Sequence, residues 1–256
     1  MSLHLGYAIF LFVAGMLGGA MNAVAGGGSF IAFPALVFTG VPQVPANATN
    51  TVALWTGIVF SGGAFRDRLD VPRRVMIPLL ITSFIGGVAG ALLLLWTPEH
   101  TFAKVLPWLM AGATLLFVFG RKLARGGLLS VGHEASAAAI IGASVFELGV
   151  AVYGGYFGGG LGIVNLALLS AIGMTDIHAM NALKSVLGSA INGVAVIVFV
   201  LKKAVFWPQA TVMIAGAALG GYFGARYSLR LRPSLVRWFV ILVGAAMSAY
   251  FFVRAY

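Results

Sequence analysis

Long apolar runs separated by short polar breaks make up almost the whole chain. Each run approaches the roughly 20 residues that a helix needs to cross the hydrocarbon core of a bilayer. Only 9% of the residues are charged, whereas a soluble domain carries about 25%. This is too little charge to cover a water-exposed surface, so the sequence predicts an all-α integral membrane protein whose outer surface faces lipid.

Eight runs are long enough to be transmembrane helices, and two further apolar pieces are shorter. The expected spans cover residues 5–25, 47–65, 75–96, 105–120, 136–157, 181–201, 208–226 and 234–253. The shorter pieces cover residues 29–39 and 161–172. A helix of about 12 residues reaches only ~18 Å across a core of ~30 Å. We therefore expect re-entrant or broken helices there, and one membrane domain over residues 1–256.

An internal repeat divides the chain into two halves, residues 5–120 and 136–254. Three motifs recur in the same order, the first 132 residues later and the other two 134 residues later. The pairs are Gly26–Gly28 with Gly158–Gly160, Asn47–Asn50 with Asn181–Lys184, and Gly86–Gly90 with Gly220–Gly224. Glycine triplets alone carry little weight in a chain with 35 glycines, but three ordered blocks indicate a duplication. The expected architecture is two repeated four-helix halves, each with a glycine-broken re-entrant helix.

Basic residues are unevenly distributed over the breaks, and loops rich in Lys and Arg stay in the cytoplasm. If the short pieces are re-entrant, the halves are parallel and both termini lie with the larger basic group in the cytoplasm. That group is Arg66, Arg68, Arg73, Arg74, Arg121, Lys122, Arg125, Lys202, Lys203 and Arg254. The opposite side holds Lys104, Arg226, Arg230 and Arg232.

If the short pieces cross the membrane instead, the chain forms ten segments in two inverted halves. Lys202, Lys203 and Arg254 then exchange sides with Arg226, Arg230 and Arg232, and the tally is unchanged. Charge therefore does not separate the two arrangements. The shortness of the two pieces favours the re-entrant, parallel one.

Composition and motifs exclude several classes of function. The net charge of +10 fits basic loops beside anionic lipid, and no motif for nucleic-acid binding accompanies it. With no cysteine, the chain forms no disulfide and has no thiolate chemistry. It carries no HExxH sequence, Walker loop or Cys/His set, so we expect no enzyme activity, metal or cofactor. Movement of a small solute across the membrane remains the leading expectation.

The two glycine triplets are the leading candidates for a binding site. Three consecutive glycines weaken a helix, and a break within the membrane must line a cavity or be buried in protein. Breaks at matching places in two halves are typical of transporter binding sites. The N-terminal ends of the restarted helices would favour an anion. The alternative is that the glycines only let helices pack closely.

Polar side chains at membrane depth add to this hypothesis, and Lys184 is the most informative of them. A buried Lys is costly within a membrane unless it meets an aqueous cavity and an anion, although it could instead extend to the interface. Asn50 takes its place in the first half. Glu147 is the one acid deep inside an expected span. It could carry protons, or it could be a fixed partner of Lys184 or of an Arg.

The ordered motifs resemble the sulfite exporter TauE/SafE family, which consists of duplicated four-transmembrane units. The resemblance rests on N-x-x-A-G-G-G-S-x-x-x-x-P-A-L from Asn22, the A-N-A-T-N that follows, and GGYFGGGLGIVNLALL with NALKS in the second half. It implies an exporter of sulfite or small organosulfonates, driven by the proton gradient. The implied substrate-binding residues are Gly26, Gly27, Gly28, Ser29, Thr49, Asn50, Gly158, Gly159, Gly160, Asn181 and Lys184.

The sequence and the family resemblance predict a multi-pass carrier in the cell inner membrane. Its expected partners are a small anion and the lipid bilayer, and Glu147 is the candidate for proton coupling. A homo-oligomer is left open, as are the identity of the anion and the direction of transport. Three alternatives for the function are left open. They are a carrier or channel for another small anion, a membrane scaffold or assembly protein without cargo, and an intramembrane enzyme, which ranks last because only one deep acid is present.

Overall fold

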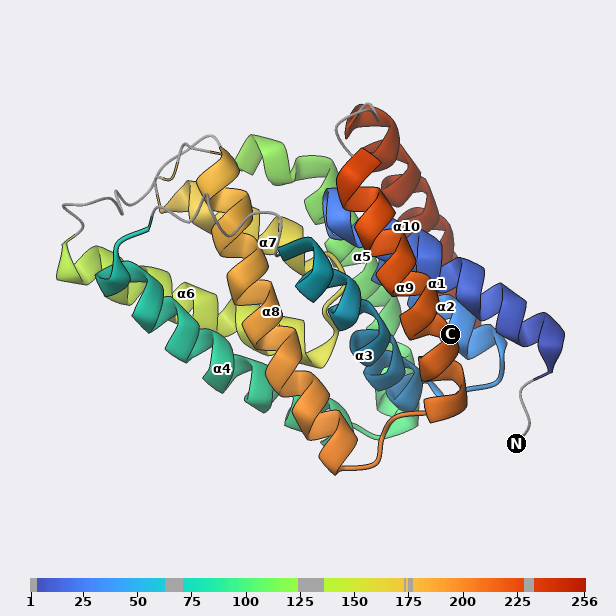
Figure 1. The fold of residues 1–256 in the computed structure, drawn as a ribbon. Helices are drawn as coiled ribbons and strands as arrows, with labels where there is room; N and C mark the ends of the chain where they lie inside the picture. Colours follow the sequence, from blue (N-terminus) through green and yellow to red (C-terminus); the bar gives the residue numbers. More distant parts are fainter. Residues whose placement is uncertain (1–3, 63–70, 124–135, 173, 175–176, 228–232) are drawn as a thin grey trace.

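The computed structural model describes residues 4–62, 71–123, 136–172, 174, 177–227 and 233–256, and within these ranges it consists of α-helices (Figure 1). Eight helices have 20 to 25 residues. They are α1 (Leu5–Ala25), α3 (Gln43–Gly62), α4 (Arg73–Trp96), α5 (Glu99–Leu123), α6 (Ala137–Tyr156), α8 (Ile177–Leu201), α9 (Trp207–Tyr227) and α10 (Pro233–Ala255). Two helices are short, α2 (Ser29–Phe38) and α7 (Leu161–Ala171).

Six of the long helices are both long and apolar enough to cross a membrane. Helices α3 and α9 have the length, but their described residues contain no stretch that is apolar enough. The side chains of Asn47 and Asn50 in α3 are buried, as is Gln209 in α9, so these helices put polar groups inside the protein. Large apolar side chains remain exposed elsewhere, such as Val145 at 65% and Leu242 at 64%, which fits a surface that contacts lipid.

The repeat predicted from the motifs matches the helix order. Three helices of the first half, α3, α4 and α5, begin at Gln43, Arg73 and Glu99. Their counterparts α8, α9 and α10 begin at Ile177, Trp207 and Pro233, each 134 residues further on.

The counterparts run in opposite directions. A Cβ added to Gly15 would lie 2.6 Å from Met213 O, and one on Gly224 would lie 2.7 Å from Ala20 Cα, so α1 and α9 run parallel. By the same kind of contact α4 runs parallel to α6, whereas α5 and α10 are antiparallel, with the Trp108 ring 5.0 Å from that of Phe252. Helices α1, α3, α5 and α9 therefore point one way, and α4, α6, α8 and α10 point the other way.

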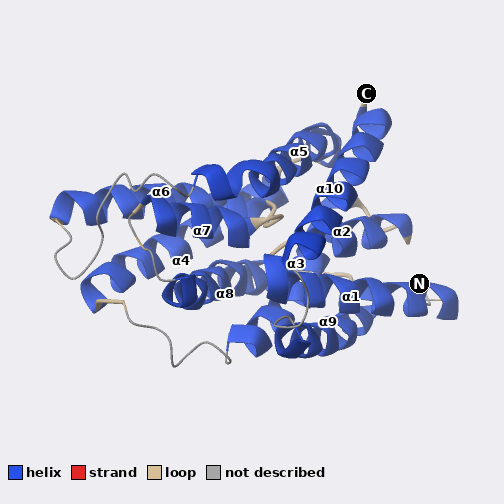
Figure 2. Cartoon of the chain, turned by 90° about the horizontal axis from the view of Figure 1, so that it is seen from above, coloured by secondary structure: helices blue, strands red, loops and turns tan. Residues whose placement is uncertain are grey.

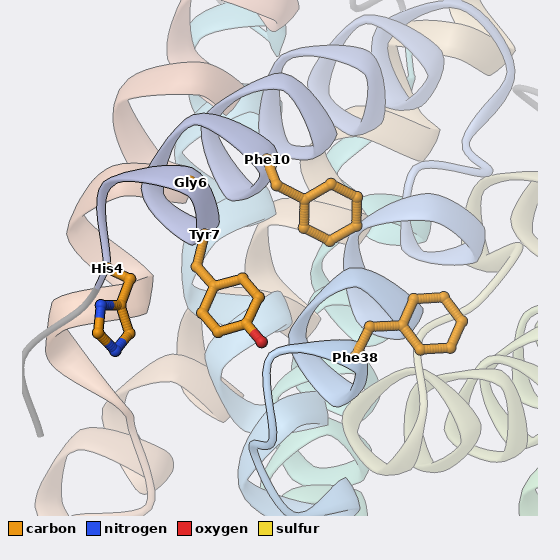
Figure 3. Close-up of a pocket in the computed structure, with 5 residues that line it drawn as sticks. All are labelled: His4, Gly6, Tyr7, Phe10 and Phe38. Carbon is orange, nitrogen blue, oxygen red and sulfur yellow. The ribbon is translucent and has the colours of Figure 1, made fainter.

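This inverted relation corrects the parallel arrangement that the sequence favoured. The short helix α2 returns along α1, because Phe38 at its end lies beside His4, Tyr7 and Phe10 at the start of α1 (Figure 3). Helix α3 therefore starts at the end of the molecule where α1 started. Each short helix is thus the second arm of a hairpin. The shortness of these pieces did not distinguish such an arm from a re-entrant loop, which would return to the side of the membrane where the preceding helix ends.

The fourth helix of each half is exchanged between the halves. Helix α9 packs on α1 and α3, while α4 packs on α6 and α8. We call α1, α2, α3, α9 and α10 the terminal bundle, and α4 to α8 the central bundle. Figure 2 shows α4, α6, α7 and α8 of the central bundle on one side of the view and the terminal bundle on the other, with α5 beside α10. The bundles meet through α3 with α8 and α5 with α10. Glycine-lined contacts at Gly86–Gly90 and Gly220–Gly224 hold the exchanged helices close to their neighbours.

Candidate functional site

The two glycine breaks meet where the bundles join. Gly26 caps α1 in the left-handed region at φ 78°, and Gly158 and Gly160 have φ 71° and 72° between α6 and α7. L-residues with side chains rarely adopt this conformation, so glycine is required at these turns. A Cβ on Gly26 would lie 3.2 Å from Gly162 Cα. The tips of the two hairpins, which enter from opposite ends of the molecule, therefore touch.

Close packing accounts for part of the first triplet. A Cβ on Gly28 would overlap the carbonyl of Gly18, and one on Gly27 would lie 2.8 Å from Val240 and 2.9 Å from Phe117. Similarly, Gly159 packs against the ring of Phe157. Within one break, close helix packing therefore accounts for some of the glycines, while their neighbours lie at the candidate binding site.

The helix ends supply fewer backbone donors than the sequence argument assumed. The N–H groups of Phe30 and Ile31 donate to Gly27 O and Gly28 O, at 3.2 and 3.1 Å. In the second hairpin, Ile163 N donates to Gly160 O at 2.9 Å. These donors close turns within the breaks, so polar side chains must supply more of any contact with a bound solute.

On the first-half side, α3 carries the polar side chains of the Asn47–Asn50 motif. Asn50 Nδ2 donates to Ser29 Oγ at 3.2 Å, which links α3 to the first residue of α2. Thr49 is engaged elsewhere, since its hydroxyl donates to Pro45 O and accepts from Phe206 N at 3.0 Å. Asn50 and Ser29 thus lie at the break, whereas Thr49 fixes the connection between α8 and α9.

On the second-half side, Lys184 takes the place of Asn50. Its Nζ donates to Asn181 Oδ1 at 3.0 Å, and its Cδ lies 3.5 Å from where a Cβ on Gly162 would be. The side chains of Lys184 and Asn181 are both half-buried. The ammonium group is thus part of a polar pair beside the point where the two tips meet.

Glu147 lies away from this pair. It is fully buried on α6, and its Oε1 accepts a hydrogen bond of 2.5 Å from Ser83 of α4. Its Oε2 is buried with no hydrogen-bond partner. The contacts therefore place Glu147 with Ser83 between two helices of the central bundle, and not with Lys184, whose amide partner is Asn181.

Two further residues lie close to the breaks. Asn165 of α7 is fully buried, and Trp55 of α3 donates its indole N–H to Ser189 O of α8 at 3.1 Å. Asn165 could have been noticed as a lone amide in the apolar run LGIVNLALL. The contact that Trp55 makes could not have been predicted from the sequence, because it depends on how α3 crosses α8. Trp55 and Ser189 are themselves 134 residues apart, so their contact lies on the pseudo-twofold axis.

The comparison with known protein families agrees with this architecture. The family model described as "Sulfite exporter TauE/SafE" matches residues 11–251, which is nearly the whole chain. The chain belongs to the sulfite exporter TauE/SafE family. It is therefore a membrane transporter protein, and both glycine breaks lie inside the matched region.

Curated relatives carry transporter names. The chain is 28% identical to "Probable membrane transporter protein" of Haemophilus influenzae over 240 residues, 93% of this chain and 92% of the relative. It is 28% identical to "Probable membrane transporter protein YfcA" of Escherichia coli K12 over 246 residues, 93% of this chain and 87% of the relative. "Probable membrane transporter protein ORF9" of a Sinorhizobium species is 27% identical over 245 residues, with 93% and 90% covered. No solved structure matches the chain.

Proposed function

We propose that this TauE/SafE protein exports sulfite or a small organosulfonate anion across the cell inner membrane, driven by the proton gradient. The Lys184 ammonium group beside the touching hairpin tips is the observation that carries the proposal. A cation at that place attracts an anion, and Asn181 positions it. Asn50 and Ser29 supply polar groups from the other hairpin. Inverted repeats with broken helices at their interface are typical of carriers rather than channels.

A binding experiment with the Lys184→Ala variant tests the assignment. Hydrogen bonds to charged groups contribute about 1.5–3 kcal/mol, so the loss of the ammonium group should weaken sulfite binding by about 10- to 100-fold. Calorimetry on the purified protein gives the dissociation constant. Lys104→Ala is the matched control, because it removes a lysine charge from an exposed position near the start of α5. Equal sulfite affinity in wild type and Lys184→Ala would contradict the site.

The helix directions also bear on the orientation of the carrier. The end of the molecule with the starts of α4, α6, α8 and α10 carries Arg73 and Arg74, and α5 and α9 finish there with Arg121, Lys122 and Arg226. The connections at that end carry five more basic residues in sequence, and they lie outside the described residues: Arg66, Arg68, Arg125, Arg230 and Arg232. The opposite end holds Lys104, Lys202, Lys203 and Arg254.

By the positive-inside rule the more basic end faces the cytoplasm. Both termini are at the other end, since His4 and the C-terminal part of α10 each lie beside the end of α2, with the Tyr250 ring 5.3 Å from that of Phe38. The proposed orientation therefore has both termini outside the cytoplasm. It replaces the expectation of cytoplasmic termini, which depended on the parallel arrangement.

A further inference from the structure

The amide group of Asn165 is buried in the protein without a hydrogen-bond partner. Its side chain is 0% exposed, and both Nδ2 and Oδ1 lack a partner. Asn47, Asn50, Gln43 and Gln209 also have unpartnered buried atoms, but in each of these the atom is an acceptor oxygen. Among the buried side-chain atoms of the described residues, Asn165 Nδ2 is thus the nitrogen donor left without an acceptor. A bound anion needs hydrogen-bond donors, and this nitrogen is a donor without an acceptor.

Asn165 lies on the face of α7 that is directed at the hairpin tips. The Cβ direction of Gly162, three residues earlier, is toward Gly26 Cα at 3.4 Å and Lys184 Cδ at 3.5 Å. Residues three apart on a helix share a face. Asn165 therefore lies one turn along α7 from the contact between the tips, on the side that Lys184 approaches.

The first hairpin has nothing equivalent. The spacing of the glycine triplets matches Asn165 with Phe33, whose ring packs 6.4 Å from Phe157 and 5.8 Å from Phe251. Since Lys184 likewise replaces Asn50, the second half holds both the cation and the unpartnered donor. The polar groups of the site are thus concentrated away from the pseudo-twofold axis that Trp55 and Ser189 mark.

We propose that Asn165 is a substrate-binding residue, whose Nδ2 donates to an oxygen of the anion that Lys184 attracts. The anion then binds off the axis, between α7 and α8, and not symmetrically between the two hairpins. This inference rests on the proposed function. It explains why a buried amide is kept where an apolar side chain would fold more stably, since an unsatisfied buried donor destabilises a protein until a ligand satisfies it.

The Asn165→Leu variant separates a binding role from a structural one, because leucine has a similar size and no polar atoms. Sulfite affinity is measured by calorimetry, and the melting temperature of the ligand-free protein is measured in the same detergent. We expect sulfite affinity to fall at least tenfold while the melting temperature stays equal or rises. Asn165→Asp should abolish sulfite binding, because it places a carboxylate against the anion.

Ser248→Ala is the matched control, since Ser248 is a buried polar residue whose hydroxyl, among the described residues, bonds only to Gly244 O in its own helix. It should bind sulfite as wild type does. Wild-type affinity in Asn165→Leu would overturn this inference alone, provided that Lys184→Ala still loses binding. A lower melting temperature together with weaker binding would assign Asn165 a structural role and also overturn it. Absence of sulfite binding by the wild type would overturn both this inference and the proposed function.

Discussion

Glu147 and Ser83 join α6 to α4 at a fully buried position with no counterpart in the first half. The alignment of the halves puts Gly15 and Ala217 there, so the terminal bundle has no acid at this place. Proton coupling, if it uses Glu147, is therefore confined to the central bundle. The free Oε2 is the atom that would exchange a proton.

The Glu147→Gln variant tests this role. Glutamine keeps an acceptor for the Ser83 hydroxyl but cannot bind and release a proton, so a pH gradient should no longer drive sulfite transport into or out of proteoliposomes. Sulfite binding at a fixed pH should change less than threefold, because Glu147 does not contact the hairpin tips, and this measurement is the control. Gradient-driven transport at the wild-type rate in the variant would remove Glu147 from the mechanism.

Motifs located the candidate residues unevenly. Asn50, Asn181 and Lys184 were identified because they recur or substitute for one another at matching places, and the structure puts all three close to the breaks. Thr49 belongs to the same motif, yet its hydroxyl bonds to Phe206 N. That bond depends on how α9 begins beside α3, which a local pattern does not encode. Asn165 was overlooked because its counterpart Phe33 breaks the repeat.

At the scale of helices, the start of α3 is held by a residue from another bundle. Glu99 of α5 accepts hydrogen bonds from Gln43 N and Val44 N at 3.1 and 3.0 Å, so its carboxylate caps two backbone donors more than fifty residues away. A carboxylate at a helix N-terminus also interacts favourably with the helix dipole. This contact ties the central bundle to the helix that carries Asn47, Thr49 and Asn50.

Glu99→Ala should destabilise the protein by about 1 kcal/mol, the usual cost of removing a helix cap. A lower midpoint of thermal unfolding in detergent would report this loss. His100→Ala is the neighbouring control, since the exposed His100 side chain contacts only Thr101 among the described bonds, and its midpoint should not change. If Glu99→Ala unfolds at the wild-type temperature, the carboxylate contributes no stability at this cap.

Hydropathy predicted the helices well but placed some of their ends incorrectly. The expected span at residues 47–65 begins four residues earlier in the structure, at Gln43, and the one at 105–120 begins at Glu99. In both cases polar residues were assigned to the loop, although the helix includes them. The cause at α3 is the distant cap from Glu99, because a contact between residues so far apart in sequence leaves no local pattern.

At the scale of the whole molecule, orientation in the membrane can be tested with single cysteines, because the chain has none of its own. Lys202→Cys and Arg73→Cys place exposed thiols at opposite ends of the protein. A membrane-impermeant maleimide should label Lys202→Cys in intact cells and Arg73→Cys only after permeabilisation. The reverse pattern would refute the proposed orientation, and labelling of both in intact cells would refute the opposite placement of these ends.

The motif spacing predicted an internal duplication, but it did not predict which helices pack together. Motif spacing shows that α4 and α9 correspond, and it says nothing about which bundle each joins. Charge counts did not separate the parallel from the inverted arrangement, because Lys202, Lys203 and Arg254 equal Arg226, Arg230 and Arg232 in number. Only the glycine contacts of α9 with α1 and of α4 with α6 show the exchange and the inversion.

The exchange of α4 and α9 has a consequence for how the protein is made. The first three helices are made before the central bundle, but α9, which packs against α1 and α3, is made only after it. The central bundle is contiguous in sequence and can assemble first. Until α9 is made, the glycine-lined faces of the first helices that α9 will cover remain exposed to lipid. A nascent chain halted before Trp207 thus contains the complete central bundle and three further helices that lack their partner α9. The faces that α9 would cover are the part that quality-control proteases of the membrane would encounter.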